Sequence, residues 1–389
     1  MVSLADYAGR EQSYVKHVFL ERYLEALIFK TASAYDHIVY VDGFAGPWQS
    51  ASEQFEDTSF GIALNALRRA KAAWKKNDRN VRMTALLVER DAAAYERLAT
   101  IRPKYPDIEI KPYHADFLSI VPELVKDIPS GAFAFFLIDP KGWRIPLDDL
   151  RPLLARPKSE VTFNFMFEFI NRAASMTEPA IVQGLDELMP YGNWRQRLRD
   201  AQERQGGPLT SEEREQILVD AFKENLRQVG GYEYVADTPV LRPLRDRTLY
   251  CLFYATRHER GIAAFRDCQG TALAAQSTTR AAGKIRHAES SSGQSELFDS
   301  LHDMAPDKMA DRLEHERGMA EATIMELVPA QPESIAYLKL WPHVLARHMV
   351  RLTDVNVICG RLRKEGRLLF PDWELLKRVP KDHYRVQRP

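Results

Sequence analysis

The chain has 389 residues, of which 45% are hydrophobic and 28% charged, a globular balance with enough length for one large domain and a smaller one. No stretch approaches the roughly 20 consecutive apolar residues that a membrane span needs, and the polar N-terminus does not predict a secretory signal. Cys251, Cys268 and Cys359 lie far apart, which excludes a disulfide framework and a paired-cysteine metal site. We therefore expect a cytoplasmic protein without membrane contact.

Charge is unevenly distributed although the net charge is zero. Residues 335–389 hold twelve Lys and Arg against five Asp and Glu, a net charge of +7, so the rest of the chain carries −7. A basic C-terminal module of this kind favours a nucleic-acid partner. A solvated surface with surplus arginine explains the count equally well.

Apolar runs alternate with helical patterns from residue 12 to residue 169. We expect buried strands at 37–46, 81–90, 108–117, 131–143 and 159–169. We expect helices at 12–32, 62–74, 91–101, 117–125 and 147–154. This alternation predicts an α/β fold with a doubly wound, Rossmann-like parallel sheet.

A different pattern follows this alternation. Residues 172–230 are polar and helical, and Thr210 with Glu213 forms a capping-box signature, so this segment predicts a helical insertion. Two further strands are expected at 232–243 and 247–258, joined by a short turn. Residues 276–300 are polar and predict a linker, which gives domains at 1–275 and 301–389.

Four carboxylates stand where four consecutive predicted strands end: Asp42, Glu89, Asp116 and Asp139. Open parallel sheets bind ligands outside the carboxyl ends of their strands. The sequence therefore predicts a binding site lined by these acids.

The loop after the first strand begins at Asp42 and continues through Gly43, Phe44 and Gly46. Its glycines permit a tight turn and a close backbone approach to a ligand. The loop is neither a GxGxxG nor a P-loop motif, so it does not predict a phosphate site. S-adenosylmethionine carries no phosphate and suits this loop as the cofactor. The alternative is a glycine-containing turn with a solvated Asp42.

The next two acids suit the nucleoside part of such a cofactor. Glu89 offers two coplanar acceptors for the vicinal hydroxyls of a ribose, and Asp91 is the better candidate to cap the following helix. Asp116 would bind the adenine amino group, with Phe117 beside the ring. Helix capping by Asp116 is an equally good interpretation.

Asp139-Pro140-Lys141-Gly142-Trp143 is the candidate catalytic loop. Amino-methyltransferases place an acid or amide before a proline and an aromatic residue, so that oxygens bind the target amine and the aromatic stacks on the base. Here Trp143 comes one place late, and a turn with a core-facing Trp143 is the alternative. Lys16, on the first predicted helix, could reach the same edge, although a charged helical residue is more often solvated.

These segments together resemble the three-Cys-motif partner proteins (TcmP). The resemblance rests on Lys16-His17, the run DGFAGPW (42–48), the run IDPKG (138–142) and the run FNF (163–165). It implies a class I S-adenosylmethionine-dependent methyltransferase-like fold and a genomic partner with a three-cysteine, iron–sulfur-type motif. The motifs are also similar to those of ribosomal RNA adenine methyltransferases. Trp48 and Lys141 depart from the family pattern.

The basic C-terminal module predicts a winged helix. We expect helices at 335–349 and 353–366, followed by wing strands at 367–370 and 383–386. The second helix would present basic residues to phosphates, and a basic loop would lie between the wing strands. These nucleic-acid-binding candidates are Arg361, Arg363, Lys364, Lys377 and Arg378. A winged helix that docks onto a protein is the alternative.

The sequence thus predicts a methyltransferase that uses S-adenosylmethionine and acts on nucleic acid. The second hypothesis is a non-catalytic scaffold that binds nucleic acid or a three-Cys iron–sulfur partner protein. A metallohydrolase or nuclease is a weaker third, because the sequence contains no HExxH, cysteine-pair or GxSxG motif and no metal site is predicted, although strand-end acids can bind Mg²⁺.

Overall fold

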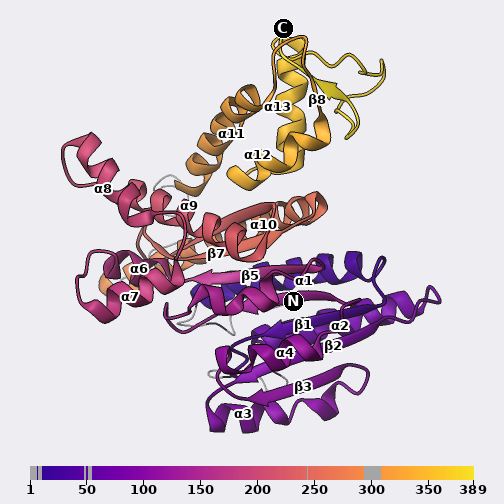
Figure 1. Cartoon of the computed structure of the whole chain (residues 1–389), viewed down its shortest axis with the longest axis vertical. Helices are drawn as coiled ribbons and strands as arrows, with labels where there is room; N and C mark the ends of the chain where they lie inside the picture. Colours follow the sequence, from indigo (N-terminus) through magenta and orange to yellow (C-terminus); the bar gives the residue numbers. More distant parts are fainter. Residues whose placement is uncertain (1–6, 8–10, 48–49, 51–54, 243, 293–307) are drawn as a thin grey trace. The chain divides into compact units, whose positions relative to one another are not determined.

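A computed structural model describes residue 7 and residues 11–47, 50, 55–242, 244–292 and 308–389 (Figure 1). The chain divides into two compact units, Met1–Arg257 and His258–Pro389. The division falls earlier than the boundary expected at residue 275, and the units are described separately below.

A seven-stranded sheet forms the centre of the first unit (Figure 1). Its strands are β1 (His37–Asp42), β2 (Arg82–Glu89), β3 (Glu109–His114), β4 (Phe133–Ile138), β5 (Ser159–Phe165), β6 (Tyr234–Leu241) and β7 (Thr248–Thr256). The order across the sheet is β3-β2-β1-β4-β5-β7-β6. Strands β1 to β5 are parallel, and β7 is antiparallel to both of its neighbours. The predicted α/β fold with a mostly parallel sheet is confirmed.

Helices connect the strands and follow the predicted order. They are α1 (Glu11–Thr31), α2 (Ser59–Lys75), α3 (Ala92–Ala99), α4 (Val121–Asp127), α5 (Arg151–Leu154), α6 (Phe167–Ala173), α7 (Pro179–Leu188), α8 (Trp194–Gln205) and α9 (Ser211–Gly230). Helices α6 to α9 lie between β5 and β6, where the insertion at 172–230 was expected. The capping box of Thr210 and Glu213 at the start of α9 is confirmed.

The two faces of the sheet have separate cores. On one face, Tyr23 of α1 lies 5.9 Å from the ring of Phe135, and Tyr40 stacks on the same ring at 6.2 Å. On the other face, Val39 and Val41 join a large apolar cluster that includes residues of α4, α5 and α9. Strand residues alternate between the faces, so the parallel strands β1, β2, β4 and β5 are buried on both sides.

A buried carboxylate fixes α1 to the sheet. Tyr23 donates a hydrogen bond to Glu160 Oε2 at 2.7 Å, and Thr256 donates to Oε1 at 2.8 Å. Burial, and then the charge of Glu160, raises the pKa of Tyr23, so this hydroxyl stays a donor. Because Lys16 precedes Tyr23 by two helical turns, this anchor also fixes where Lys16 lies.

The described residues of the second unit form the helices α10 (Glu259–Ser292), α11 (Lys308–Leu327), α12 (Trp341–Arg347) and α13 (Leu352–Lys364). The linker expected at 276–300 is helical through Ser292, and its remainder lies outside the described residues. The reason is that Ala272 and Leu273 are buried and that Thr279 bonds back to the Ala275 carbonyl at 2.7 Å. Polar composition alone concealed this helix.

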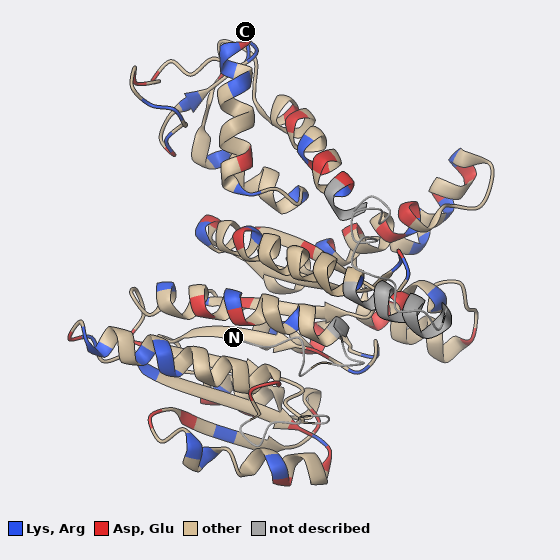
Figure 2. Ribbon diagram, turned by 180° about the vertical axis from the view of Figure 1, so that it is seen from behind, with Lys and Arg blue, Asp and Glu red and all other residues tan. Residues whose placement is uncertain are grey.

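A single helix was expected at 335–349, and this prediction is wrong. Ile335–Ala336 is a short strand, β8, which pairs antiparallel with β9 (Arg385–Val386), and α12 starts only after it, with Pro342 in its first turn. The segments 367–370 and 383–386 also do not pair with each other as expected, because Leu369 bridges to Gln387 instead. Helix α13 ends in a basic turn, and the loop after it carries further Lys and Arg (Figure 2).

None of the helices in the described ranges is long and apolar enough to span a membrane.

The Tyr23 anchor is testable. Tyr23→Phe keeps the ring but leaves the buried Glu160 with one donor fewer, so we expect a loss of about 2 kcal/mol in the free energy of unfolding, measured by urea denaturation. Tyr105→Phe is the matched control, since its hydroxyl bonds to the neutral Asn65, and it should cost about 1 kcal/mol or less. Equal losses in the two variants would contradict the anchor.

Candidate functional site

Strand register places three of the predicted acids on one face of the sheet. Asp42 pairs with Leu87 of β2 and with Leu137 of β4. Glu89 and Asp139 lie two residues beyond those partners, and side chains two apart on a strand point to the same side. Asp42, Glu89 and Asp139 therefore share the face that α1 covers, at the carboxyl edge.

Asp42 is completely buried and satisfied by the chain itself. Its Oδ2 accepts from the Tyr40 hydroxyl at 3.0 Å and from the Ser59 hydroxyl at 2.7 Å, and Oδ1 accepts from the Phe44 amide at 3.0 Å. Burial, and to a smaller extent the charge of Asp139, raises the pKa of Asp42 to about 6 against these hydrogen bonds. Asp42 thus ties the first loop to the start of α2.

The loop after β1 is held on both sides. The Gly43 amide bonds to the Leu137 carbonyl at 3.1 Å and the Ala45 amide to the Val88 carbonyl at 2.8 Å. A Cβ on Gly43 would lie 3.0 Å from the Phe117 ring, so only glycine lets the loop approach this ring without displacing it. Phe44 packs on Phe117 with ring centroids 5.5 Å apart. Gly46 is half-buried in the same loop, and Trp48 lies outside the described residues.

Glu89 is 5% exposed and retains an acceptor. Its Oε1 accepts from the Asp91 amide at 2.6 Å, and no hydrogen bond to Oε2 is found in the part of the chain that the structure describes. Asp91, as expected, caps α3 through the Ala94 amide. One oxygen of Glu89 is therefore available to a ligand at this edge.

Asp116 lies apart from this cluster. Its side chain is 51% exposed, accepts from the Leu118 amide at 3.1 Å and stands 3.7 Å from Arg90. This bond is a local turn contact, since the N-cap of the short 3-10 helix that follows is Phe117 and not Asp116. Phe117, beside it, is buried under the first loop.

Both oxygens of the Asp139 carboxylate have a partner on this face of the sheet. Lys16 of α1 forms an ion pair with Oδ2, and Asn164 of β5 donates to Oδ1 at 2.5 Å. Burial alone would raise the pKa of Asp139, but the Lys16 charge and these hydrogen bonds hold it below its ordinary value. His17 contributes in the same direction and bonds to Tyr7 at 2.8 Å. The carboxylate remains ionised at an edge where its own side chain is 18% exposed.

Asn164 is a site residue whose role sequence reasoning missed. The sequence linked it to the site only as part of the FNF run. No hydrogen-bond donor for its buried Oδ1 is found among the described residues, and this oxygen lies beside the amide nitrogen that donates to Asp139. Burying an acceptor without a donor costs free energy. A ligand that donates a hydrogen bond to this oxygen would remove that cost, so the oxygen marks a position for a ligand donor. A polar residue between two phenylalanines in a buried strand was the available signal.

Trp143 packs inward, which is the alternative considered for it. A Cβ on Gly184 of α7 would lie 2.6 Å from Trp143 Cζ3. Pro140 is buried and Lys141 is exposed. Burial lowers the pKa of Lys141, while the charge of Glu89 opposes this.

The basic candidates of the second unit fall into two groups. Arg361 forms ion pairs with Glu321 and Glu365, and Arg363 lies 4.3 Å above the Trp373 ring. Lys364, Lys377 and Arg378 are exposed, and no ion pair is found for them among the described residues. Only the second group presents uncommitted positive charge.

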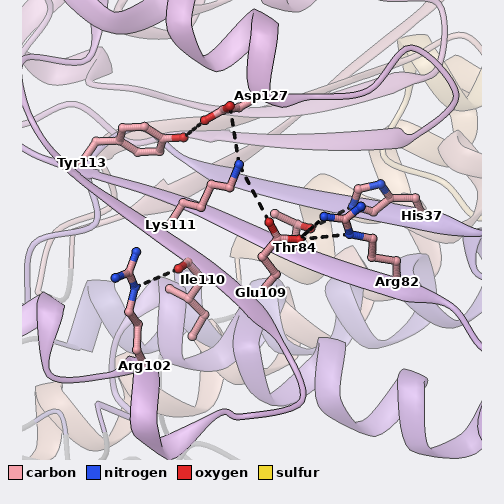
Figure 3. A network of polar contacts seen from close by, with 9 residues as sticks. All are labelled: His37, Arg82, Thr84, Arg102, Glu109, Ile110, Lys111, Tyr113 and Asp127. Carbon is pink, nitrogen blue, oxygen red and sulfur yellow. Dashed lines mark hydrogen bonds and ion pairs between the residues drawn. The ribbon is translucent and has the colours of Figure 1, made fainter.

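Polar residues at the opposite edge of the sheet pair with one another (Figure 3). Arg82 bonds to Glu109 Oε2 at 2.6 Å, Thr84 donates to the same oxygen at 3.2 Å, and Thr84 contacts His37 at 2.8 Å. Hydrogen bonding from Arg82 lowers the pKa of Glu109. This network connects the first residues of β1, β2 and β3, so we assign it to strand pairing.

The raised pKa of Asp42 predicts a pH-dependent stability. A carboxyl with a pKa of about 6 in the folded state and 3.8 otherwise contributes stability below pH 4 that is lost as pH rises through 6. Asp42→Asn does not titrate, so its free energy of unfolding should gain up to about 3 kcal/mol relative to wild type between pH 4 and pH 7. Chemical denaturation across this range measures the difference, and parallel curves for the two proteins would disprove the assignment.

No protein-family model and no curated protein matches the chain. Three solved structures illustrate its likenesses. Protein LPL1258 from Legionella pneumophila is 12% identical with a TM-score of 0.37, over 63% of this chain and 85% of that one. The precorrin-6y C5,15-methyltransferase from Geobacter metallireducens is 12% identical with a TM-score of 0.27, over 60% and 87% of the two chains. M. jannaschii TYW2, in complex with AdoMet, is 10% identical with a TM-score of 0.27, over 60% and 74%.

At these TM-scores the likenesses carry no argument about function. The fold class is given by the sheet itself: five parallel strands followed by a pair in which β7 runs antiparallel. This is the Rossmann-like sheet, with an antiparallel strand near one edge, that the sequence resemblance implied.

Proposed function

We propose that the chain is an S-adenosylmethionine-dependent methyltransferase that acts on nucleic acid, of the three-Cys-motif partner type. The observation that carries the proposal is the register that brings Asp42, Glu89 and Asp139 to one face at the carboxyl edge of a parallel sheet. Ligands of such sheets bind at that edge. Three carboxylates converging there suit a ligand with a ribose and a cationic centre.

The residues at this edge fit the cofactor. Glu89 has an acceptor for a ribose hydroxyl, the glycine loop allows close backbone approach, and Phe117 with Phe44 offers an apolar wall for a purine. Asp42 acts through the loop that it orders and not by contact, since it is fully buried. Asp116 would reach the adenine amino group only from the solvent side. When bound, S-adenosylmethionine supplies an electrophilic methyl group.

Asp139 is the group that would position the methyl acceptor. A carboxylate offers about four lone-pair sites, and Lys16 and Asn164 occupy two. The remaining sites can accept from an N–H of a target base, and Lys16 keeps the carboxylate ionised for that purpose. Pro140 would hold the loop in the required turn. Trp143 would contribute through the packing of this loop on Gly184 and not as a stacking platform.

The second unit would supply the nucleic-acid contact. From α11 onward its elements run helix, strand, helix, helix and then two extended segments, with β9 pairing to β8 and Leu369 to Gln387. That order agrees with a winged helix in which α13 is the reader. Lys364, Lys377 and Arg378 would contact phosphates directly, whereas Arg361 and Arg363 are held by Glu321 and Trp373.

A non-catalytic scaffold is the second candidate. Two observations favour it: both oxygens of Asp139 already accept hydrogen bonds, and Trp143 faces inward. Such a scaffold would bind nucleic acid or a three-Cys iron–sulfur partner protein without transferring a methyl group.

Calorimetry with S-adenosylmethionine tests the cofactor. We expect wild type to bind and Glu89→Ala to bind at least 10-fold more weakly, about 1.4 kcal/mol, because the ribose acceptor is lost. Asp42→Ala should also weaken binding, by releasing the first loop. Glu96→Gln, on the exposed side of α3, is the control and should match wild type. Absence of binding by folded wild type would overturn the cofactor assignment.

The Lys16–Asp139 pair separates the enzyme from the scaffold. In Lys16→Met the carboxyl stays buried without its cation, so its pKa should rise and the acid limb of methyl transfer should move to higher pH. Lys16→Arg keeps the positive charge, so the acid limb of its pH profile should stay where it is in wild type. Transfer from radiolabelled cofactor to RNA and to DNA provides the measurement, and cofactor binding with no transfer to either would favour the scaffold.

A further inference from the structure

Two adjacent leucines in the second unit project into solvent. Leu375 is 99% exposed and Leu376 is 91% exposed. They lie in the loop between Phe370 and Tyr384, the position of a wing. Single exposed apolar residues need no explanation, but a contiguous apolar tip marks an interaction site.

The loop that carries them is well organised. Trp373 packs against Phe370 and Tyr384 with ring centroids 5.3 and 5.9 Å away. Its Nε1 bonds to the Lys377 carbonyl at 3.0 Å, and the Lys377 amide bonds to the Glu374 carbonyl at 3.0 Å. These bonds close a turn whose central residues are Leu375 and Leu376. The fold therefore holds the two side chains outward at low conformational cost.

The loop also lies against α13. The Arg378 carbonyl is 3.8 Å from where a Cβ on Gly360 would stand, and Arg363 of α13 covers Trp373. A ligand that contacts the exposed face of α13 can thus reach the leucine tip.

Charge around the tip is positive. Glu374 is paired with Lys381, and Asp372 accepts from the Arg385 amide. Lys377 and Arg378 follow the leucines directly and are exposed, with no ion pair found in the described parts of the chain. An apolar point followed directly by two exposed cations matches a nucleic-acid duplex, which offers stacked bases between two rows of phosphates.

We propose that Leu375 and Leu376 form a wedge that enters the minor groove of duplex DNA and partly unstacks a base step, while Lys377 and Arg378 contact the flanking phosphates. Apolar wedges of this kind kink the duplexes that minor-groove proteins bind. DNA is the duplex, because a helix such as α13 fits the major groove of B-form DNA but not the deep, narrow groove of A-form RNA. The inference rests on the proposed nucleic-acid function and names its substrate class.

A membrane surface is the less suitable occupant. Two leucine side chains hold far fewer carbon atoms than one myristoyl chain, which by itself gives only marginal binding. The charges of Lys377 and Arg378 would add little to this membrane affinity.

The experiment uses the full chain and a DNA duplex of about 25 base pairs with 2-aminopurine at central steps. Affinity is measured by anisotropy over a salt series, and unstacking by 2-aminopurine fluorescence. Leu375→Ala/Leu376→Ala should bind about 10-fold more weakly, keep the salt slope and lose the fluorescence rise. Lys377→Gln/Arg378→Gln should lower the salt slope by about two. Met319→Ala, an exposed apolar residue on α11, is the control and should match wild type.

The outcomes separate the two proposals. If wild type binds no duplex at any salt concentration, the nucleic-acid function fails. If wild type binds with its salt slope but the leucine variant retains both affinity and fluorescence rise, the wedge fails and nucleic-acid binding stands. Tighter binding to duplex RNA or to phosphatidylserine vesicles, or leucine-dependent self-association in sedimentation, would also overturn the wedge.

Discussion

The ion pair between Lys16 and Asp139 joins residues 123 positions apart and determines what the carboxyl edge of the sheet can do. Two carboxylates, Asp42 and Asp139, lie close enough on one face for each charge to disfavour the other. The protein resolves this by giving them different partners. Asp139 receives a cation and an amide donor, so its pKa falls, while burial raises the pKa of Asp42 to about 6 although its neutral hydrogen-bond donors oppose the rise. Paired carboxyls with separated pKa values are the pattern of sites where one group stays charged for chemistry and the other supports structure.

This separation depends on packing some distance from the edge. The Tyr23–Glu160 bond fixes α1 on the sheet and so fixes the height of Lys16. On the opposite face, Gly184 of the helical insertion receives Trp143, which anchors the loop that begins at Asp139. The insertion therefore has a direct structural link to the candidate catalytic loop, since a side chain at position 184 would displace Trp143. Packing on both faces of the sheet therefore positions the loop 139–143: α1 contacts it at Asp139 and α7 contacts it at Trp143.

Intramolecular contacts divide the basic residues of the second unit into those that are paired within the unit and those that remain exposed. Glu321 on α11 binds both Arg361 and Arg367, and aromatic stacking occupies Arg363. These arginines hold the helices and the loop between Phe370 and Tyr384 together, whereas Lys364, Lys377 and Arg378 are exposed on the surface. The net charge of +7 over 335–389 thus overstates the positive charge that this segment offers to a partner. The positions of the exposed Lys364, Lys377 and Arg378 are more informative than the net charge.

The sequence by itself determined the α/β class, the strand-end carboxylates and the insertion, because hydrophobic periodicity and turn residues are local signals. The capping residues Asp91 and Thr210 were recognisable for the same reason. Only tertiary structure decided that Lys16 and Asn164 meet at Asp139, that Trp143 faces inward and that Asp116 stands apart, since each depends on register and on contacts between distant segments. The same is true of 276–292 and 335–349: burial turned a polar run into helix, and the pairing of β8 with β9 interrupted an expected one.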